Sequence, residues 1–183
     1  IIIEGERVYS QKRYESETVV ADILRSRAGA KSKYAAVSKE NIEACISEIQ
    51  EELEVDLDPL QREAVEMALY NQVSVLTGGA GCGKTTTLRF IIGVMEKLSK
   101  LHRFAGCDIA LAAPTGMAAK RMMAATGKEA KTIHKLIEYN PALPALTLNE
   151  DNPLPYDFVI VDELSMVDVD TMAMLLRATR RDT

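Results

Sequence analysis

Eight residues, Gly78–Thr85, read Gly-Gly-Ala-Gly-Cys-Gly-Lys-Thr and match the pattern GxxxxGK followed by Ser or Thr. Glycines let successive backbone N–H groups turn toward one phosphate, because no Cβ stands in the way. In this chemistry the Lys84 ammonium reaches the β- and γ-phosphates, and the Thr85 hydroxyl ligates Mg²⁺. A plain glycine turn is the alternative, but an apolar stretch before the loop and a helical pattern after it favour a triphosphate site.

The loop therefore predicts binding of a nucleoside triphosphate, with ATP and Mg²⁺ as the expected cofactors. A helix that begins near Lys84 is expected to add its positive N-terminal end to the site. The residues predicted to hold the nucleotide are Gly78, Gly79, Ala80, Gly81, Cys82, Gly83, Lys84, Thr85 and Thr86.

Two acids, Asp162 and Glu163, directly follow the apolar run Phe158–Val161. At the carboxyl end of a strand, Asp162 can hold Mg²⁺ through a water, while Glu163 orients or deprotonates the attacking water. A pair of solvated acids at a strand end is the alternative, and it would be favoured if the glycine loop were absent. We predict Lys84, Asp162 and Glu163 as catalytic residues, with Thr85 and Asp162 as the metal site.

Two further segments have side chains or helix starts that could contact a nucleic-acid backbone. Pro114, Thr115 and Gly116 precede a helical pattern whose free N–H groups could hold a phosphate, although a simple strand-to-helix turn explains them equally well. Thr132 and His134 could act in the same way, but a lone histidine in a short helix is more often a packing or surface residue.

Ahead of the glycine loop, Asp58, Pro59 and Gln61 have the pattern of a helix start. Asp58 is a good N-cap, Pro59 suits the first turn, and Gln61 stands where a capping-box partner is expected. Capping accounts for all three residues, so composition and spacing alone do not indicate a contact with adenine.

The elements that must position these residues fall into two parts. Residues 57–183 alternate apolar strands with helices, which predicts a parallel sheet covered on both faces. Residues 1–56 read as a helical lead-in segment with a short strand or hairpin around Gly5. The strands expected in the second part are 73–77, 108–113 and 158–161, and the helices of the whole chain are 13–27, 39–54, 84–98, 117–125, 132–139 and 169–178, with 140–156 as a loop.

Composition restricts the classes of protein. The chain has 183 residues, 47% of them hydrophobic, and a net charge of −5, which argues against a general nucleic-acid coat but allows a local basic groove. No segment is long enough to span a bilayer, and the first residues do not read as a signal peptide. Three cysteines without CxxC spacing favour neither zinc nor disulfides, so we expect the cytoplasm and no membrane partner.

Five separated motifs together resemble the RecD-like DNA helicases of superfamily 1, over roughly residues 55–175. They occur in the order and spacing of that family, which makes the resemblance specific. The motifs are LDPLQREAV at 57–65, GGAGCGKTTT at 78–87, APTGMAAKRM at 113–122, TIHKLI at 132–137 and VIVDELSMVD at 159–168.

The resemblance implies a RecA-like P-loop fold with three α/β/α layers, and 5′-to-3′ translocation on single-stranded DNA driven by ATP hydrolysis. It implies that Gln61 reads adenine. It also implies that Pro114, Thr115 and Gly116, and less firmly Thr132 and His134, touch the DNA. The loop departs from the family at Ala80 and Cys82, and neither change removes an N–H donor or the Lys84–Thr85 pair.

Family members continue past the position of Thr183 with a strand that senses the γ-phosphate and with a second motor domain that supplies arginine fingers. Arg177, Arg180 and Arg181 do not match those fingers. We therefore expect an incomplete first motor domain that lacks a central strand of its sheet and binds nucleotide without unwinding DNA. The expected compensation is a rearranged sheet or self-association of the fragment.

Two other functions fit the same loop. One is a P-loop ATPase without helicase activity, against which the segments 114–116 and 132–134 speak. The other is a nucleotide-regulated interaction module, against which the presence of Glu163 argues.

Overall fold

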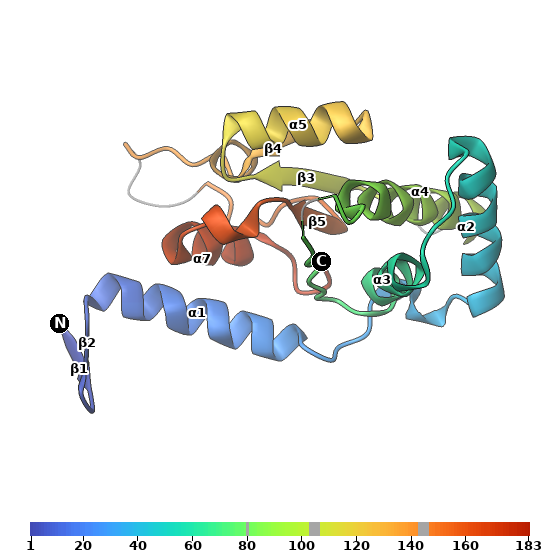
Figure 1. Cartoon of the computed structure of the whole chain (residues 1–183). Coiled ribbons are helices and arrows are strands. Elements are labelled where there is room, and N and C mark those ends of the chain that lie inside the picture. Colours follow the sequence, from blue (N-terminus) through green and yellow to red (C-terminus); the bar gives the residue numbers. More distant parts are fainter. Residues whose placement is uncertain (80, 103–106, 143–146) are drawn as a thin grey trace.

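The computed structural model describes residues 1–79, 81–102, 107–142 and 147–183 (Figure 1). Within these residues no helix has the length and apolar character needed to cross a membrane. In chain order the elements are β1 (Ile2–Glu4), β2 (Arg7–Tyr9), α1 (Gln11–Arg27), the 3₁₀ helix η1 (Lys33–Ala36), α2 (Lys39–Leu53), α3 (Pro59–Tyr70), α4 (Lys84–His102), β3 (Ile109–Ala113), α5 (Gly116–Thr126), β4 (Ala130–Thr132), α6 (Ile133–Leu136), β5 (Phe158–Val161), the 3₁₀ helix η2 (Leu164–Met166) and α7 (Val169–Ala178).

A parallel sheet with strand order β4-β3-β5 lies at the centre of the α/β part (Figure 1). Side chains of β3 alternate between its two faces, as a strand requires. Ala110 and Ala112 pack toward α6 and α7, whereas Leu111 packs against Ile92 of α4 and Met122 of α5. Helices therefore cover both faces of the sheet, which confirms the predicted three-layer α/β/α class.

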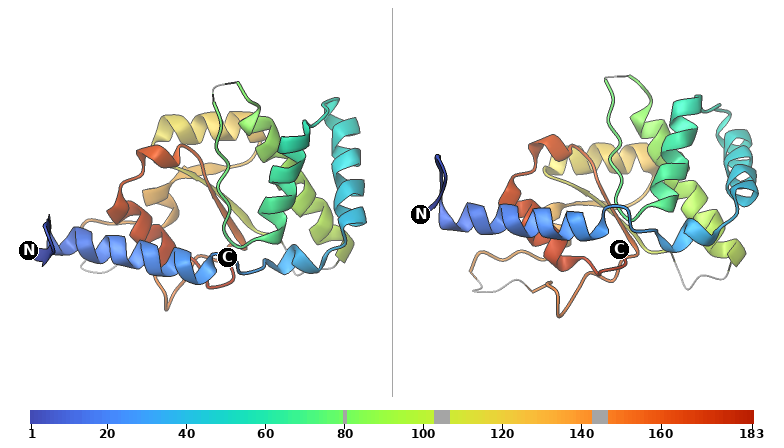
Figure 2. Two further views of the ribbon diagram at one scale, coloured as in Figure 1. Left: turned by 60° about the horizontal axis from the view of Figure 1, so that its bottom comes forward. Right: turned by 90° about the horizontal axis from the view of Figure 1, so that it is seen from below.

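The predicted strand at 73–77 is wrong, because these residues form no strand in the structure. They run as a coil from the end of α3 to the glycine loop (Figure 2). Val75 is 66% exposed and Leu76 is 39% exposed. In the part of the chain that the structure describes, β5 pairs only with β3, so no neighbouring strand offers this segment backbone partners. Among the described residues, 73–77 makes no backbone hydrogen bond to another segment.

The short strand β4 was not expected from the sequence, because Ala130 and Lys131 have low strand propensity and the three residues Ala130–Thr132 are too few to show a pattern. It pairs with β3, with Leu111 opposite Ala130 and Ala113 opposite Thr132. The helix predicted over 132–139 is consequently shorter than expected, and Thr132 is its N-cap as predicted.

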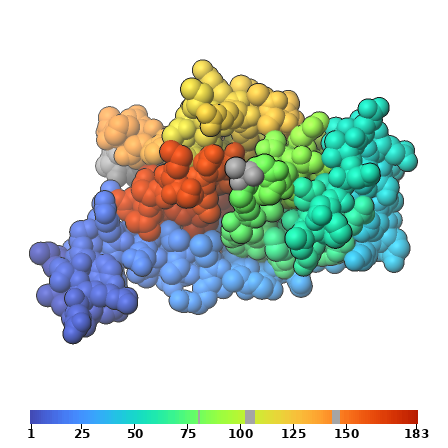
Figure 3. Space-filling view, viewed as in Figure 1, coloured from blue at the N-terminus to red at the C-terminus, as the bar shows by residue number. Residues whose placement is uncertain are grey.

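Residues 1–56 pack closely onto the rest of the chain. Helix α2 approaches α4 so nearly that a Cβ placed at Gly93 would lie 2.9 Å from the Ile49 Cδ1 atom. Helix α1 lies along α7, with Lys12 paired to Asp170 at 3.3 Å (Figure 1). The predicted hairpin, β1 with β2, projects beyond the first turn of α1 (Figure 3).

Candidate functional site

The start of α3 contacts the glycine loop through one side chain. The capping box predicted for Asp58 and Gln61 is confirmed: the Asp58 N–H donates to Gln61 Oε1 at 3.0 Å, and the Leu60 N–H donates to Asp58 Oδ1 at 2.9 Å. The other end of the same amide, Gln61 Nε2, donates to the carbonyl oxygen of Cys82 at 3.2 Å. Helix α3 is thus joined to the loop 21 residues further along the chain.

Two glycines of the loop have a backbone conformation that other residues rarely adopt. Gly81 and Gly83 have φ values of 75° and 80°, the left-handed region that favours glycine. A Cβ at Gly83 would collide with the Gln61 amide nitrogen, and one at Gly78 would collide with the Cys82 thiol. Of the predicted loop residues, Ala80 lies outside the described part of the chain.

Lys84 stands at the first turn of the 19-residue helix α4. Its ammonium group donates to the carbonyl oxygens of Gly78 at 2.6 Å and Gly79 at 2.7 Å. One turn later the buried Thr87 hydroxyl donates to the Gly83 carbonyl at 3.1 Å. Thr85 is exposed and Thr86 is half-buried. The ammonium group also donates to the Cys82 sulfur at 3.8 Å. A flexible cation held by neutral partners beside a helix start fits a triphosphate, whose charged oxygens are the stronger partners for an ammonium group.

The two predicted catalytic acids lie at the carboxyl end of β5 and are exposed. The Asp162 N–H donates to the Ala112 carbonyl at 2.9 Å, which extends the pairing of β5 with β3 by one residue. Glu163 has φ 53° and ψ 40°, a left-handed conformation, and its N–H donates to Asp162 Oδ1 at 2.9 Å. Non-glycine residues held in this region are strained and cluster at functional sites. Sequence reasoning did not find this signal, because no residue type encodes it.

The predicted DNA-side residues meet the acids at one edge of the sheet. Strands β3, β4 and β5 are parallel, so Pro114, Thr132 and Asp162, which follow or end them, lie at the same carboxyl edge. The Thr115 hydroxyl accepts from the Ala118 N–H at 3.2 Å, and Gly116 begins α5.

On the neighbouring helix, the Thr132 hydroxyl accepts from the Lys135 N–H at 3.3 Å. His134 is exposed, and its ring meets Tyr139 edge-on at 5.3 Å between centroids. Both threonine hydroxyls therefore have a capping role already.

The structure does not join the loop to the acids. No hydrogen bond or ion pair among the described residues links Lys84 or Thr85 to Asp162 or Glu163. Since 73–77 is not part of the sheet, strand pairing does not fix the distance between the two halves of the predicted site.

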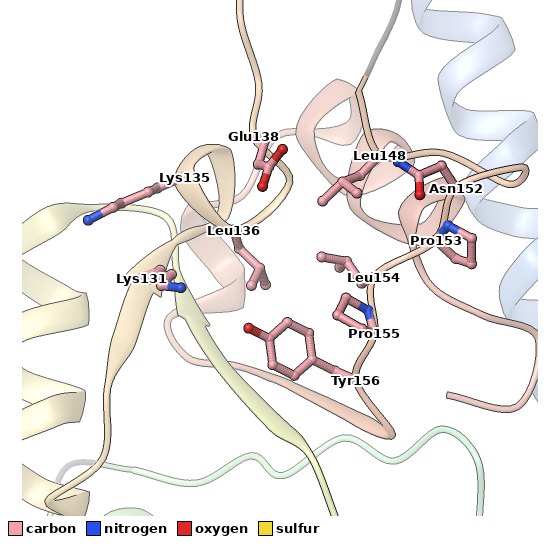
Figure 4. Close-up of a pocket in the computed structure, with 10 residues that line it drawn as sticks. All are labelled: Lys131, Lys135, Leu136, Glu138, Leu148, Asn152, Pro153, Leu154, Pro155 and Tyr156. Carbon is pink, nitrogen blue, oxygen red and sulfur yellow. The ribbon is translucent and has the colours of Figure 1, made fainter.

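A cavity of about 380 Å³ lies below α6, away from the glycine loop (Figure 4). Leu136, Leu154 and Tyr156 point into it, and Lys131 stands at its edge (Figure 4). None of its lining residues belongs to Gly78–Thr85, so the predicted triphosphate site is an exposed cradle and not this hollow.

Comparison with known proteins gives one family and several relatives. The family model described as AAA domain matches residues 61–183. The RecBCD enzyme subunit RecD of Mycolicibacterium smegmatis is 38% identical over an alignment of 140 residues, which covers 67% of this chain and 25% of that protein. The ATP-dependent RecD2 DNA helicase of Deinococcus radiodurans is 38% identical over 118 residues, or 64% of this chain and 15% of that protein.

A RecBCD enzyme subunit RecD from Buchnera aphidicola matches the whole chain at 26% identity, over 31% of its own length. This chain therefore spans between 15% and 31% of the length of these three relatives.

Proposed function

The chain belongs to the AAA domain family, and from that premise we propose that it is the nucleotide-binding part of an ATP-dependent DNA helicase that moves 5′-to-3′ along single-stranded DNA. The predicted resemblance to RecD-like helicases is confirmed by the RecD and RecD2 relatives. The helicase activity of the whole protein is a proposal, because this chain matches only part of the length of those relatives.

One observation carries the nucleotide site: the Lys84 ammonium lies between the carbonyls of Gly78 and Gly79, in a loop whose Gly81 and Gly83 are left-handed. We assign Lys84 to the β- and γ-phosphates. Thr85 and Asp162 would hold Mg²⁺, which when bound supplies charge neutralisation on the phosphate oxygens. Glu163 orients the attacking water and takes its proton.

For the DNA side, we assign backbone contacts to Pro114, Thr115 and Gly116, and further contacts to Thr132 and His134. The shared carboxyl edge of β3, β4 and β5 supports this assignment, because it places these residues beside the acids. Such contacts position a strand without reading its sequence. The resemblance implies that Gln61 reads adenine, but its amide oxygen and nitrogen both have partners within the chain, so we do not assign it to the base.

We also propose a second motor domain in the same protein, which completes the DNA groove and supplies arginine fingers in trans. This chain spans only 25% and 15% of the length of the RecD and RecD2 relatives, which supports that proposal. Within the chain, Arg180 is occupied with Asp157 at 2.8 Å, which speaks against a finger role for it.

The test compares ATP binding, ATP turnover and strand separation, with and without single-stranded DNA, for this chain and for the proposed longer protein that carries a second motor domain. We expect ATP binding by both, and DNA-stimulated turnover and unwinding by the longer protein alone. ATP turnover that is insensitive to single-stranded DNA in the longer protein would support an ATPase without translocation. ATP binding with no turnover in either protein would support an interaction module.

A further inference from the structure

Both the oxygen and the nitrogen of the Gln61 side-chain amide are hydrogen-bonded within the chain. Its Oε1 accepts from the Asp58 N–H at 3.0 Å, and its Nε2 donates to the Cys82 carbonyl at 3.2 Å. The first contact fixes the side chain to the start of α3, and the second reaches the glycine loop. The amide is therefore a bridge between a helix end and the loop.

The loop is shaped around this bridge. Gly83 follows the bonded carbonyl, and a Cβ at Gly83 would collide with the Gln61 amide nitrogen. Gly83 in turn accepts from the buried Thr87 hydroxyl at 3.1 Å. The Cys82 carbonyl is thus held by Gln61, and the Gly83 carbonyl is held by the first turn of α4. That turn also carries Lys84.

Base reading requires a different use of the same atoms. A glutamine recognises adenine by pairing its carbonyl oxygen and amide N–H₂ with one edge of the base, as in bidentate recognition elsewhere. Here the oxygen and the nitrogen already have partners within the chain.

We propose that Gln61 is a positioning residue for the phosphate loop: by bonding Cys82, it sets the loop conformation that receives the triphosphate, whatever the base. The inference rests on the proposed nucleotide site and deepens it. It predicts that Gln61 contributes to the binding of ligands that have no base at all.

The discriminating variant is Gln61→Glu. The carboxylate retains an oxygen for the Asp58 N–H, so the capping box survives, but an acceptor replaces the donor to the Cys82 carbonyl. The matched control is Gln11→Glu, an exposed glutamine of α1 whose amide bonds only Glu15. Unchanged melting of both variants establishes that the fold is intact, and Gln61→Ala removes both contacts as a second test.

The first measurement needs no nucleotide. Backbone order parameters of Gly81, Cys82 and Gly83 report loop motion on the picosecond-to-nanosecond scale. We expect them to fall in Gln61→Glu and to stay at the wild-type values in Gln11→Glu. Unchanged order parameters in both Gln61 variants would overturn the proposal. Because this readout is independent of ligand, it decides the role of Gln61 even if the chain binds no triphosphate, an outcome that would sink the proposed function instead.

The second measurement is the dissociation constant for ATP, GTP and inorganic tripolyphosphate. Loss of one hydrogen bond predicts weaker binding by roughly three- to tenfold, by the same factor for all three ligands. Weaker binding of ATP with unchanged binding of tripolyphosphate would assign Gln61 to the base and refute the positioning role.

Discussion

The ammonium nitrogen of Lys84 lies 2.6 Å from the carbonyl oxygen of Gly78, within the loop that Lys84 itself closes. The cation also donates to the carbonyl oxygen of Gly79, so its partners are uncharged groups of its own loop. A triphosphate must draw the ammonium group away from these oxygens. Charged phosphate oxygens are the stronger acceptors, so the exchange favours the ligand.

Replacing Lys84 with Ala is expected to weaken ATP binding by roughly 10- to 150-fold, because hydrogen bonds to charged groups contribute about 1.5–3 kcal/mol. Titration calorimetry with ATP and Mg²⁺ gives the value. Lys100→Ala, an exposed lysine on the same helix, removes an equal charge at a distance from the loop. Equal weakening in both variants would show that net charge, and not the loop contact, governs affinity.

Glu163→Gln is expected to lower ATP turnover roughly 10²- to 10⁴-fold while ATP binding is retained, since a general base is lost and the phosphate contacts remain. Single-turnover hydrolysis in the longer protein with single-stranded DNA measures the effect. Glu138→Gln is the matched control, because Glu138 is also exposed and has the same φ of 53°. Retained turnover in Glu163→Gln would remove the residue from the catalytic assignment.

Asp157 ties the start of β5 to three partners: Lys33 Nζ at 3.0 Å, Arg180 Nη2 at 2.8 Å and the Asp108 N–H at 3.1 Å. Burial acts to raise the pKa of Asp157, but the hydrogen bonds from Lys33 and the Asp108 N–H and the two cationic charges outweigh it and lower the pKa. A carboxyl whose folded pKa is depressed stabilises the fold above its unfolded pKa, and this stabilisation is lost as pH falls through the folded pKa.

Asp157→Asn should therefore lower the free energy of unfolding by roughly 1–3 kcal/mol at neutral pH. The difference from wild type should shrink as the pH falls below about 4. Urea denaturation between about pH 3 and pH 7 follows it, with the exposed neighbour Asp108→Asn as control. A pH-independent difference between Asp157→Asn and wild type would contradict the linkage.

Because 73–77 is unpaired, we expect a leucine in this segment to contribute far less to the free energy of unfolding than a leucine in the core. Leu98 is fully buried against α2 and α3, so Leu98→Ala should cost about 2–5 kcal/mol of unfolding free energy. Leu76 is 39% exposed, and Leu76→Ala should cost no more than about 0.5 kcal/mol. Thermal melting of the two variants is sufficient. A core-sized loss from Leu76→Ala would mean that the segment is paired in a sheet after all.

Features that depend on neighbouring residues could be predicted from the sequence, whereas features that depend on distant partners could not. The cap at Asp58 was predicted because a cap depends on residues within three positions of itself. The apolar segment 73–77 read as a strand because its composition is that of a strand, but pairing depends on a neighbour that composition does not supply.

The difference between local and distant interactions also explains which parts of the candidate site could be predicted from the sequence. The loop, Lys84 and the two acids were expected from motif and spacing, whereas the bond between Gln61 and Cys82 spans 21 positions and has no motif. The left-handed Glu163 was equally invisible, since glycine is the residue that normally indicates such a conformation.

Helix α1 is fastened to α7 near both of its ends. Lys12 pairs with Asp170 at one end, and at the other the buried Arg27 guanidinium donates to the Thr179 hydroxyl and the Arg180 carbonyl, both at 2.9 Å. Burial lowers the pKa of Arg27, and the negative charge of Asp182 opposes that shift. Helix α1, whose 17 residues span roughly 25 Å by helical rise, is therefore joined to α7 along its length. Since α7 follows the Asp162–Glu163 turn, the Lys12–Asp170 pair holds the end of α1 that carries the hairpin beside the end of α7 nearest to the two acids.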